Sequence, residues 1–150
     1  MTRLVHRDLP GYTPERIFAL AIDVEAYPRF LFWCESAAIR RREGNRLEVD
    51  NVFAIGPLRM RFRTDAVLDP PRSIEVTSTD PPFSRLRLVW TFEPLGEGGC
   101  RVSLSLDQAF RSLLFEAAAS PFTAGLEEAV IDAFVRRARD LYGQSSSVER

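Results

Sequence analysis

The segment Pro121–Tyr142, PFTAGLEEAVIDAFVRRARDLY, has hydrophobic residues three or four positions apart, which is the spacing of one helical face. That face consists of Phe122, Leu126, Val130, Ala133, Phe134, Ala138 and Leu141. Ser120 before Pro121 is typical of a helix start, and Gly143 of a helix end. The charged residues, Glu127 among them, are expected on the remaining, solvent-facing surface. The sequence therefore predicts one helix over 121–142, about 30 Å long, whose hydrophobic stripe needs a broad partner.

The chain ahead of this helix changes to a period of two, in which hydrophobic and charged residues alternate. Such alternation is typical of strands with one buried and one exposed face. It runs through Leu47–Ile55, Leu58–Leu68, Ile74–Ser78, Leu86–Phe92 and Val102–Phe110, and Arg3–Leu9 is a further strand candidate. Short turns join these stretches, so we expect a curved, meandering antiparallel sheet. Its hydrophobic face should pack against the C-terminal helix, and its polar face should carry Arg paired with Asp and Glu across strands.

Two short helical segments are expected between the first strand and the rest of the sheet. Thr13 is a candidate N-cap, and the proline that follows it suits the first helical position. Asp23–Trp33 is expected to form a second helical piece that bends at Pro28. These elements place the chain in the α+β class. We expect one domain over residues 1–143 and a disordered tail over residues 144–150.

The composition is that of a soluble globular protein, with 45% hydrophobic and 27% charged residues. The formal net charge of −1 gives no overall field that would attract nucleic acid, and we expect no DNA partner. No stretch has the pattern of a signal peptide or the length of a membrane span. These features favour a cytoplasmic protein, with transient contact at the surface of the inner membrane as a further expectation.

Motifs for catalysis or metal binding are absent from the sequence. His6 is the only histidine, and the two cysteines, Cys34 and Cys100, do not have the spacing of a zinc site. We expect His6 to be a surface or sheet residue and both cysteines to be reduced, with burial making Cys34 inert. No His, Asp or Glu is in phase with the inward-facing residues. The sequence therefore predicts no catalytic residue, no metal and no cofactor.

Four polar residues interrupt the inward-facing rows of the predicted strands, namely Asn51, Thr64, Ser78 and Gln108. A buried amide or hydroxyl group costs about 1–3 kcal/mol unless it is hydrogen-bonded. One interpretation is that these side chains bond to one another or to nearby backbone. The other is that they are the few polar contacts for a ligand inside an otherwise hydrophobic pocket. The many aromatic residues favour a hydrophobic cavity over a polar active site.

Two turns are unusually hydrophobic, Phe53–Leu58 and Pro81–Phe83. Exposed hydrophobic tips usually contact something. Docking on a membrane or a partner near the mouth of a cavity is one interpretation, and packing onto a helix is the other.

Several stretches of the chain together resemble a known family. The segment 23–34, DVEAYPRFLFWC, is similar to the D-V-x-x-Y-P-x-F-L-P-W-C signature of the coenzyme Q-binding (Coq10-like) START family. The segments 12–15, 82–92 and 130–143 resemble its first helix start, its central hairpin and its final helix. Phe32 stands where the family usually has Pro, and Pro82 and Leu88-Val89 stand where it often has Gly. The family includes the bacterial ribosome association toxin RatA and lies in the polyketide cyclase/dehydrase superfamily.

The resemblance implies a helix-grip fold, as in START and Bet v 1 proteins, with a lipid cavity between the sheet and the long helix. It implies binding of a polyisoprenoid quinone such as ubiquinone, or a related lipid, in support of respiratory electron transport and without a reaction. The expected walls of the cavity are Phe30, Trp33, Met60, Phe62, Trp90, Phe110, Val130 and Phe134. The expected polar contacts for the ligand are Thr64 and Gln108.

Two alternatives to lipid binding stay open. A RatA-like protein would bind the large ribosomal subunit and block the association of the two subunits. Its surface for RNA would be a basic patch made of Arg59, Arg61, Arg63, Arg85, Arg87 and Arg101. An enzyme of the aromatase or cyclase kind would need an acid or base inside the pocket.

Overall fold

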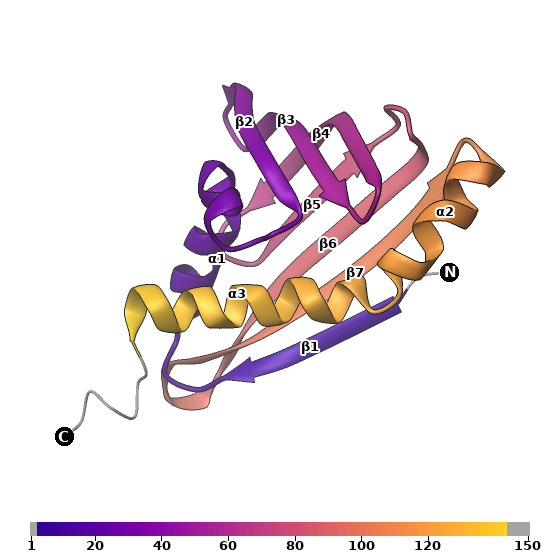
Figure 1. The fold of residues 1–150 in the computed structure, drawn as a ribbon. Helices are drawn as coiled ribbons and strands as arrows, with labels where there is room; N and C mark the ends of the chain where they lie inside the picture. The colour runs from indigo at the N-terminus through magenta and orange to yellow at the C-terminus, as the bar shows by residue number, and fades with distance from the viewer. Residues whose placement is uncertain (1–2, 144–150) are drawn as a thin grey trace.

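The computed structural model describes residues 3–143, so the tail predicted for 144–150 lies outside the described residues. The strands form one antiparallel sheet of seven, in the order β1-β7-β6-β5-β4-β3-β2 (Figure 1). They are β1 (Arg3–Leu9), β2 (Cys34–Glu43), β3 (Arg46–Ile55), β4 (Leu58–Asp69), β5 (Ser73–Ser78), β6 (Phe83–Leu95) and β7 (Gly99–Phe110). The helices are α1 (Pro14–Ile22), α2 (Leu113–Thr123) and α3 (Leu126–Tyr142), with short 3₁₀ segments η1 (Val24–Arg29) and η2 (Gly96–Gly98). The α+β helix-grip fold is confirmed.

The strand β2 has no counterpart among the stretches that alternate in sequence. It is an edge strand that pairs only with β3, and most of its residues are exposed. Its register shifts twice, once between Cys34 and Ser36 and again between Ile39 and Arg41. Each shift interrupts the alternation of faces, which explains why periodicity did not reveal this strand.

The single helix predicted over 121–142 is wrong at its start. Ser112 caps α2 by accepting a hydrogen bond from the backbone N–H of Phe115, and Pro121 lies inside α2 near its end. Gly125 then has φ +73°, a left-handed conformation that turns the chain before α3 begins at Leu126. The predicted end of the helix at Gly143 is confirmed. Phe122 and Leu126 stand four residues apart, so the sequence spacing concealed the break between them.

The first helical segments follow the predicted chemistry. The Thr13 hydroxyl accepts a hydrogen bond from the backbone N–H of Arg16 and caps α1. The second piece is a 3₁₀ helix of six residues with Pro28 inside it, so it is shorter than the predicted Asp23–Trp33. The chain beyond it places Phe32 on the surface and Trp33 in the core, at 90% and 5% exposure.

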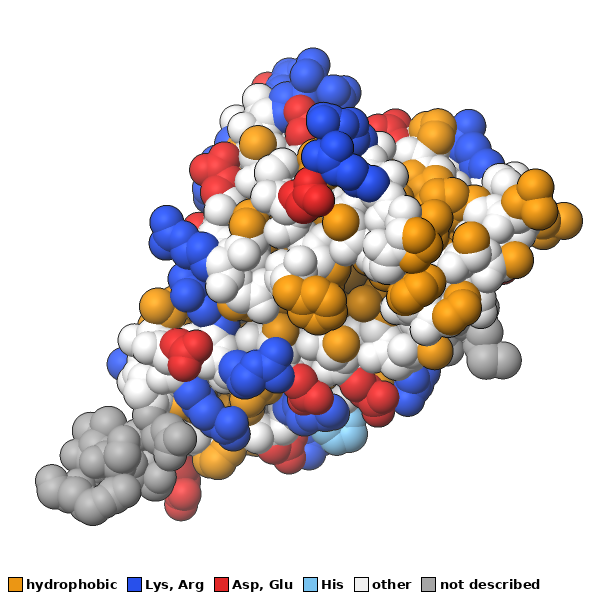
Figure 2. All heavy atoms as spheres, viewed as in Figure 1, with side chains coloured by type: hydrophobic (Ala, Val, Ile, Leu, Met, Phe, Trp, Pro, Cys, Tyr) orange, Lys and Arg blue, Asp and Glu red, His pale blue; other side chains and the backbone are white. Residues whose placement is uncertain are grey.

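Hydrophobic side chains also remain exposed on α2. Leu113 and Leu114, in its first turn, are each 84% exposed. Figure 2 shows hydrophobic side chains gathered over α2, while charged side chains of both signs lie over the tips of β2 to β4 and along α3. None of the helices formed by residues 3–143 has the length and hydrophobicity needed to cross a membrane.

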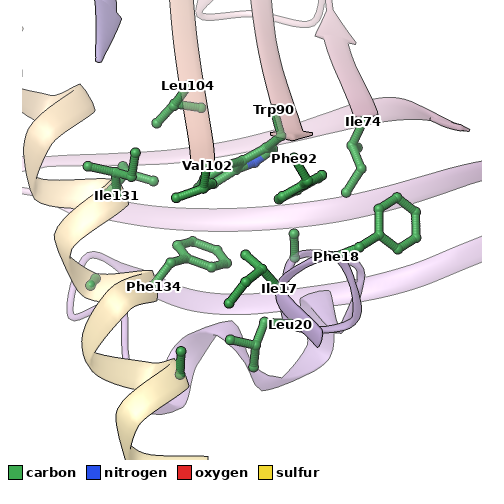
Figure 3. Packing of buried hydrophobic residues seen from close by; sticks show 14 of the residues in the cluster. Ile17, Phe18, Leu20, Ile74, Trp90, Phe92, Val102, Leu104, Ile131 and Phe134 are labelled. Atoms are coloured by element: carbon green, nitrogen blue, oxygen red, sulfur yellow. The ribbon is translucent and has the colours of Figure 1, made fainter. Parts of the chain in front are cut away.

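The core lies where α3 crosses the sheet on the side of β1 and β7 and meets α1. Ile131 and Phe134 point from α3 toward Val102 and Leu104 of β7 and toward Ile17 of α1 (Figure 3). Ile131 and Leu104 are fully buried. Leu141, which was expected on the buried face of the helix, is 50% exposed. The buried face is therefore centred on Ile131 and Phe134 in the middle of α3.

The polar face of the sheet carries the predicted cross-strand ion pairs. Arg101 and Asp8 pair at 2.7 Å between β7 and β1, and further pairs follow strand by strand across the sheet. They are Arg85–Asp107 at 3.0 Å, Arg87–Glu75 at 2.6 Å, Arg63–Asp50 at 3.1 Å and Arg40–Glu48 at 3.2 Å. Most of these groups are well exposed, so each pair adds little stability.

Candidate functional site

A hydrophobic cavity lies between the concave face of the sheet and the helices. Because α3 packs mainly on β1 and β7, it does not fill the space over β3, β4 and β5. The cavity has a volume of about 150 Å³. Figure 2 shows hydrophobic side chains around a hollow on this face. A void of this size is large enough for a benzene-sized group, so the sheet and the helix enclose room for part of a lipid.

One row of residues across five strands forms the floor of the cavity. The register places Leu47, Ala66, Val76, Leu88 and Leu106 side by side on β3, β4, β5, β6 and β7, and all five line the cavity. Val76 and Leu88 face inward at the centre of the sheet but are only half-buried. An inward residue that is not covered faces empty space, so these two mark the part of the core that the helices leave unfilled.

The structure brings together all but one of the residues predicted to bind the ligand. Those that line the cavity are Trp33, Met60, Phe62, Thr64, Trp90, Gln108, Phe110, Val130 and Phe134. They come from the loop after η1, from β4, β6 and β7, and from α3. Strand alternation placed the six sheet residues on the inner face, and helical spacing placed Val130 and Phe134, while Trp33 precedes β2 and belongs to neither pattern.

The prediction that Phe30 lines the cavity is wrong. Its ring packs edge-on against Phe134 and Tyr27, at centroid distances of 5.0 and 5.7 Å, and the Arg137 guanidinium lies over it at 5.2 Å. Tyr27 and Phe134 line the cavity themselves, so Phe30 supports the wall from behind. Tyr27 lines the cavity in place of Phe30. In the sequence, Tyr27 is only one of several aromatic residues in this segment.

Three of the four polar side chains in the inward rows are hydrogen-bonded within residues 3–143, and the fourth, Gln108, is not. The Asn51 amide donates to the backbone carbonyls of Val49 and Phe62 and to Thr64 Oγ1, the last at 3.1 Å. The Ser78 hydroxyl donates to the Arg63 carbonyl at 2.5 Å and does not line the cavity. The Gln108 side chain lines the cavity and makes no hydrogen bond within residues 3–143. Asn51 and Thr64 therefore form a hydrogen-bonded pair at the cavity wall, and Gln108 on β7 is a separate polar side chain that faces the cavity.

One carboxylate also reaches the cavity, although the sequence placed no inward Asp or Glu. Glu127, in the first turn of α3, lines it and pairs with Arg3 of β1 at 3.8 Å. The Glu127 side chain is only 12% exposed. The prediction failed because the packing of α3 on β1 and β7, which the sequence pattern does not show, brings this residue of its first turn to the cavity.

Ionisable groups are otherwise scarce in this site. Burial raises the pKa of Tyr27 well above its ordinary value, and its hydroxyl donates to the Ala21 carbonyl. The described part of the chain holds no group of three His, Cys, Asp or Glu residues that could bind a metal ion. The site is therefore built to enclose hydrophobic groups, with a few neutral polar contacts.

The two thiols have the buried environment expected of inert cysteines. Burial raises the pKa of Cys34 and of Cys100 to about 11, so neither is a thiolate near neutral pH. We expect both to be unreactive toward a disulfide reagent at pH 8 in native protein and to react fully in 6 M guanidinium. Since folding raises these pKa values, the thiols should favour the folded state below pH 9 and lose that contribution as the pH rises toward 11. Rapid labelling of either native thiol would contradict this expectation.

A second cavity adjoins the first and also measures about 150 Å³. It lies between the β3–β4 turn and the junction of α2 and α3, and Trp33, Ile55 and Leu126 line both cavities. On its outer side it is lined by the exposed ring of Phe32 and by Phe122. A Cβ at Gly56 would lie 2.5 Å from the Phe122 ring, so this glycine allows the turn to pack against α2. The turn Phe53–Leu58 thus packs on a helix, as one of its two interpretations proposed.

Comparison with known proteins places these features in context. The profile of the family described as "Polyketide cyclase / dehydrase and lipid transport" matches residues 10–135. The ribosome association toxin RatA of Pseudomonas aeruginosa is 34% identical over 142 residues, which cover 95% of this chain and 99% of RatA. The mitochondrial coenzyme Q-binding protein COQ10 of Dictyostelium discoideum is 27% identical over 156 residues, covering 99% of this chain and 76% of COQ10.

The same architecture is found among solved structures. A START superfamily protein from Mycobacterium smegmatis superposes with a TM-score of 0.77 and 17% identity, over 93% of this chain and 98% of that structure. At this level of identity the likeness concerns the fold alone. The matched residues extend over nearly the whole chain, and the fold and the position of the cavity are both consistent with this match.

Proposed function

This chain belongs to the polyketide cyclase/dehydrase and lipid transport family, and from this premise we propose that it binds a hydrophobic ligand in the cavity under α3. The observation that carries the proposal is the half-buried state of Val76 and Leu88 at the centre of the sheet. Covering them with a hydrophobic ligand would remove exposed apolar area from water, which is favourable by about 25 cal/mol per Å². Polyisoprenoid quinones and related lipids are candidates for that ligand.

Native mass spectrometry of the purified protein tests this proposal directly. We expect a fraction of the molecules to carry an added mass that organic solvent extracts and that returns when the delipidated protein is mixed with the extract. Ubiquinone in the extract would identify the ligand as a quinone. Protein that carries no adduct and takes up no hydrophobic compound would overturn the proposal.

We also propose that the protein associates with the ribosome. The named relatives favour this function over quinone binding, because the match to RatA is stronger and covers almost all of both chains, whereas the match to COQ10 is weaker. The two proposals concern different parts of the molecule. Ligand binding uses the cavity, and association with the large ribosomal subunit would use the outer surface.

The basic patch predicted for RNA contact is largely neutralised. Five of its six arginines form ion pairs with carboxylates, including Arg59 with Glu35 at 2.8 Å. Arg61 is exposed on β4 and forms no salt bridge within residues 3–143. A guanidinium that keeps its charge available binds phosphate better than one that must first leave a carboxylate. Arg61 is therefore the residue of the patch best placed to contact RNA.

Charge reversal at Arg61 tests ribosome association. We expect Arg61→Glu to reduce co-sedimentation with large ribosomal subunits at least fivefold and to lower the slope of log affinity against log salt by about one. Arg42→Glu is the matched control, because Arg42 is also exposed and unpaired among the described residues but lies on the edge strand β2. An equal loss for both variants would indicate a general charge effect, and wild-type protein that stays free at all salt concentrations would remove the proposal.

A catalytic function has less support. Among the described residues that line the cavity, only Glu127 and Tyr27 are ionisable in the range of acid–base chemistry. The carboxylate is paired with Arg3, and the phenol donates to a backbone carbonyl. General acid–base catalysis requires a group that is free to exchange its proton with a substrate. We therefore propose binding without a chemical step.

A further inference from the structure

The arginines of this chain divide into those that pair with carboxylates and those that do not. Across the outer face of the sheet, most guanidinium groups pair with Asp or Glu on a neighbouring strand. On α1, on η1 and on the last two turns of α3, by contrast, no arginine forms a salt bridge within residues 3–143. We call this group the helical arginine surface, and its members are Arg16, Arg29, Arg136, Arg137 and Arg139.

Two contacts between arginine and aromatic residues bring these three elements together. The Arg137 guanidinium lies over the Phe30 ring at 5.2 Å, and Phe30 directly follows Arg29 at the end of η1. The Arg16 guanidinium lies over the Tyr142 ring at 5.1 Å, and the Tyr142 hydroxyl donates to the Arg16 carbonyl at 3.0 Å. The C-terminal half of α3 is therefore bordered by a basic residue of η1 and by one of α1.

The contacts that hold these arginines leave their charge available. A guanidinium over an aromatic ring is oriented by the ring but is not neutralised. The buried Nε of Arg137 has no hydrogen-bond acceptor within the described chain. Arg136 and Arg139 stand three residues apart on one side of α3, both exposed, and the neighbouring Asp140 pairs with neither. A partner with several negative charges would therefore meet unpaired cations here and would displace no carboxylate.

The surroundings of this surface favour RNA over a membrane as the partner. Binding at a membrane surface combines basic residues with hydrophobic side chains that enter the lipid interface, whereas contact with a phosphate backbone needs cations alone. On α1, η1 and α3, Leu141 is the only large hydrophobic side chain that is exposed. The exposed Leu113 and Leu114 lie on α2, at the opposite end of the molecule from α1 and the C-terminal end of α3 (Figures 1 and 2).

We propose that the helical arginine surface binds the phosphate backbone of RNA, and that the protein meets the large ribosomal subunit through this surface. The second part rests on the ribosome association proposed above and assigns a face of the molecule to it. This face lies on the helical side of the protein, whereas Arg61 is the one unpaired arginine of the patch on the sheet. The two faces can therefore be tested separately.

The double variant Arg136→Glu/Arg139→Glu tests this surface, with Arg42→Glu/Arg46→Glu as its matched control. All four residues are exposed and form no salt bridge within residues 3–143, but the control pair lies at the β2–β3 hairpin. Fluorescence anisotropy with a labelled RNA duplex measures RNA binding, and co-sedimentation measures binding to large subunits. We expect the α3 variant to lose at least 20-fold in affinity for both and to lower the slope of log affinity against log salt by about two. The control should stay within threefold of wild type.

A milder variant separates loss of contact from loss of structure. Acidic residues near the C-terminal end of a helix oppose its dipole, so the charge-reversed protein has a reason to be less stable. Arg136→Gln/Arg139→Gln removes the same two cations without adding carboxylates, and we expect it to lose at least fivefold in affinity for the duplex. Circular dichroism melting of each variant checks that the fold is kept.

The outcomes distinguish failure of this surface from failure of ribosome association. If wild-type protein binds subunits and the α3 variants bind them equally well, ribosome association stands and this surface is wrong. If wild-type protein binds the duplex through these arginines but binds no subunits, the RNA surface stands and ribosome association fails. An equal loss for the α3 variant and its control, or no binding of the duplex by wild-type protein, would overturn the surface. Binding to phosphatidylglycerol vesicles that depends on these arginines, without RNA binding, would assign the surface to a membrane.

Discussion

Leu88→Trp is expected to abolish ligand uptake while leaving the fold intact. Leu88 lies next to Val76, the middle residue of the five-strand row, and faces the cavity, half-buried. An indole at this position would occupy the space that the ligand needs. We expect the affinity for a hydrophobic ligand to fall at least 100-fold, which corresponds to about 2.7 kcal/mol. Overpacking usually costs about 1–3 kcal/mol in a full core, but here the added atoms enter a void, so the stability should change by less than about 1 kcal/mol.

Titration with decanol measures the ligand affinity of Leu88→Trp, and urea unfolding of the same preparation measures its free energy of unfolding. Val67→Trp is the matched control, because Val67 lies on the outer face of β4, 42% exposed, and an indole there cannot reach the cavity. The control should bind decanol with wild-type affinity. Undiminished binding by Leu88→Trp would place the ligand elsewhere on the protein, and unfolding of the variant would show that the cavity collapses in solution.

Phe92→Ala is expected to lower the free energy of unfolding by about 3–5 kcal/mol. Phe92 is 2% exposed, and its ring contacts Phe18 edge-on at 5.7 Å and stacks on Trp90 at 6.1 Å. It does not line the cavity, so a ligand cannot fill the void that the substitution leaves. Because small domains have a total stability of about 5–15 kcal/mol, this variant should lose a large part of it.

Urea denaturation followed by circular dichroism measures this loss. Phe32→Ala removes the same number of atoms from a ring that is 90% exposed, and its cost should stay within about 0.5 kcal/mol. Phe92→Leu should fall between the two, since leucine refills part of the space. A loss below about 1 kcal/mol for Phe92→Ala would mean that the core formed by α1 and the sheet repacks freely.

The sheet could be predicted from the sequence wherever one face of a strand is buried and the other is exposed to solvent. In β4 every second residue from Met60 to Leu68 is buried and the others are exposed, so alternation alone defines the strand and its inner face. β2 has a neighbour on one side only, and its two register shifts interrupt the pattern. The break before α3 was missed because it depends on the left-handed conformation of Gly125, which no periodicity records.

The lining of the cavity could likewise be predicted from the sequence only where strand alternation defines the inward face. Inward-facing strand residues such as Met60, Phe62 and Thr64 could be named because alternation fixes the face to which they belong. Periodicity does not reveal depth, so it could not separate Phe30, which lies behind the wall, from Tyr27, which forms it. Nor could it place Glu127 at the cavity, because the rotation of α3 is set by its packing on β1 and β7.

Within residues 3–143, the strand order β1-β7-β6-β5-β4-β3-β2 leaves two open sheet edges, and both carry features that oppose strand addition by another molecule. On β2 the consecutive arginines Arg40, Arg41 and Arg42 are all exposed, and Arg40 and Arg41 pair with Glu48 and Glu43, so the edge carries charged groups that disfavour an added strand. On β1 the side chains of Arg3 and Arg7 are held by Glu128 and Asp132 of α3, at 3.2 and 2.9 Å. An incoming strand would have to displace these contacts. The arrangement disfavours extension of the open sheet by strand addition.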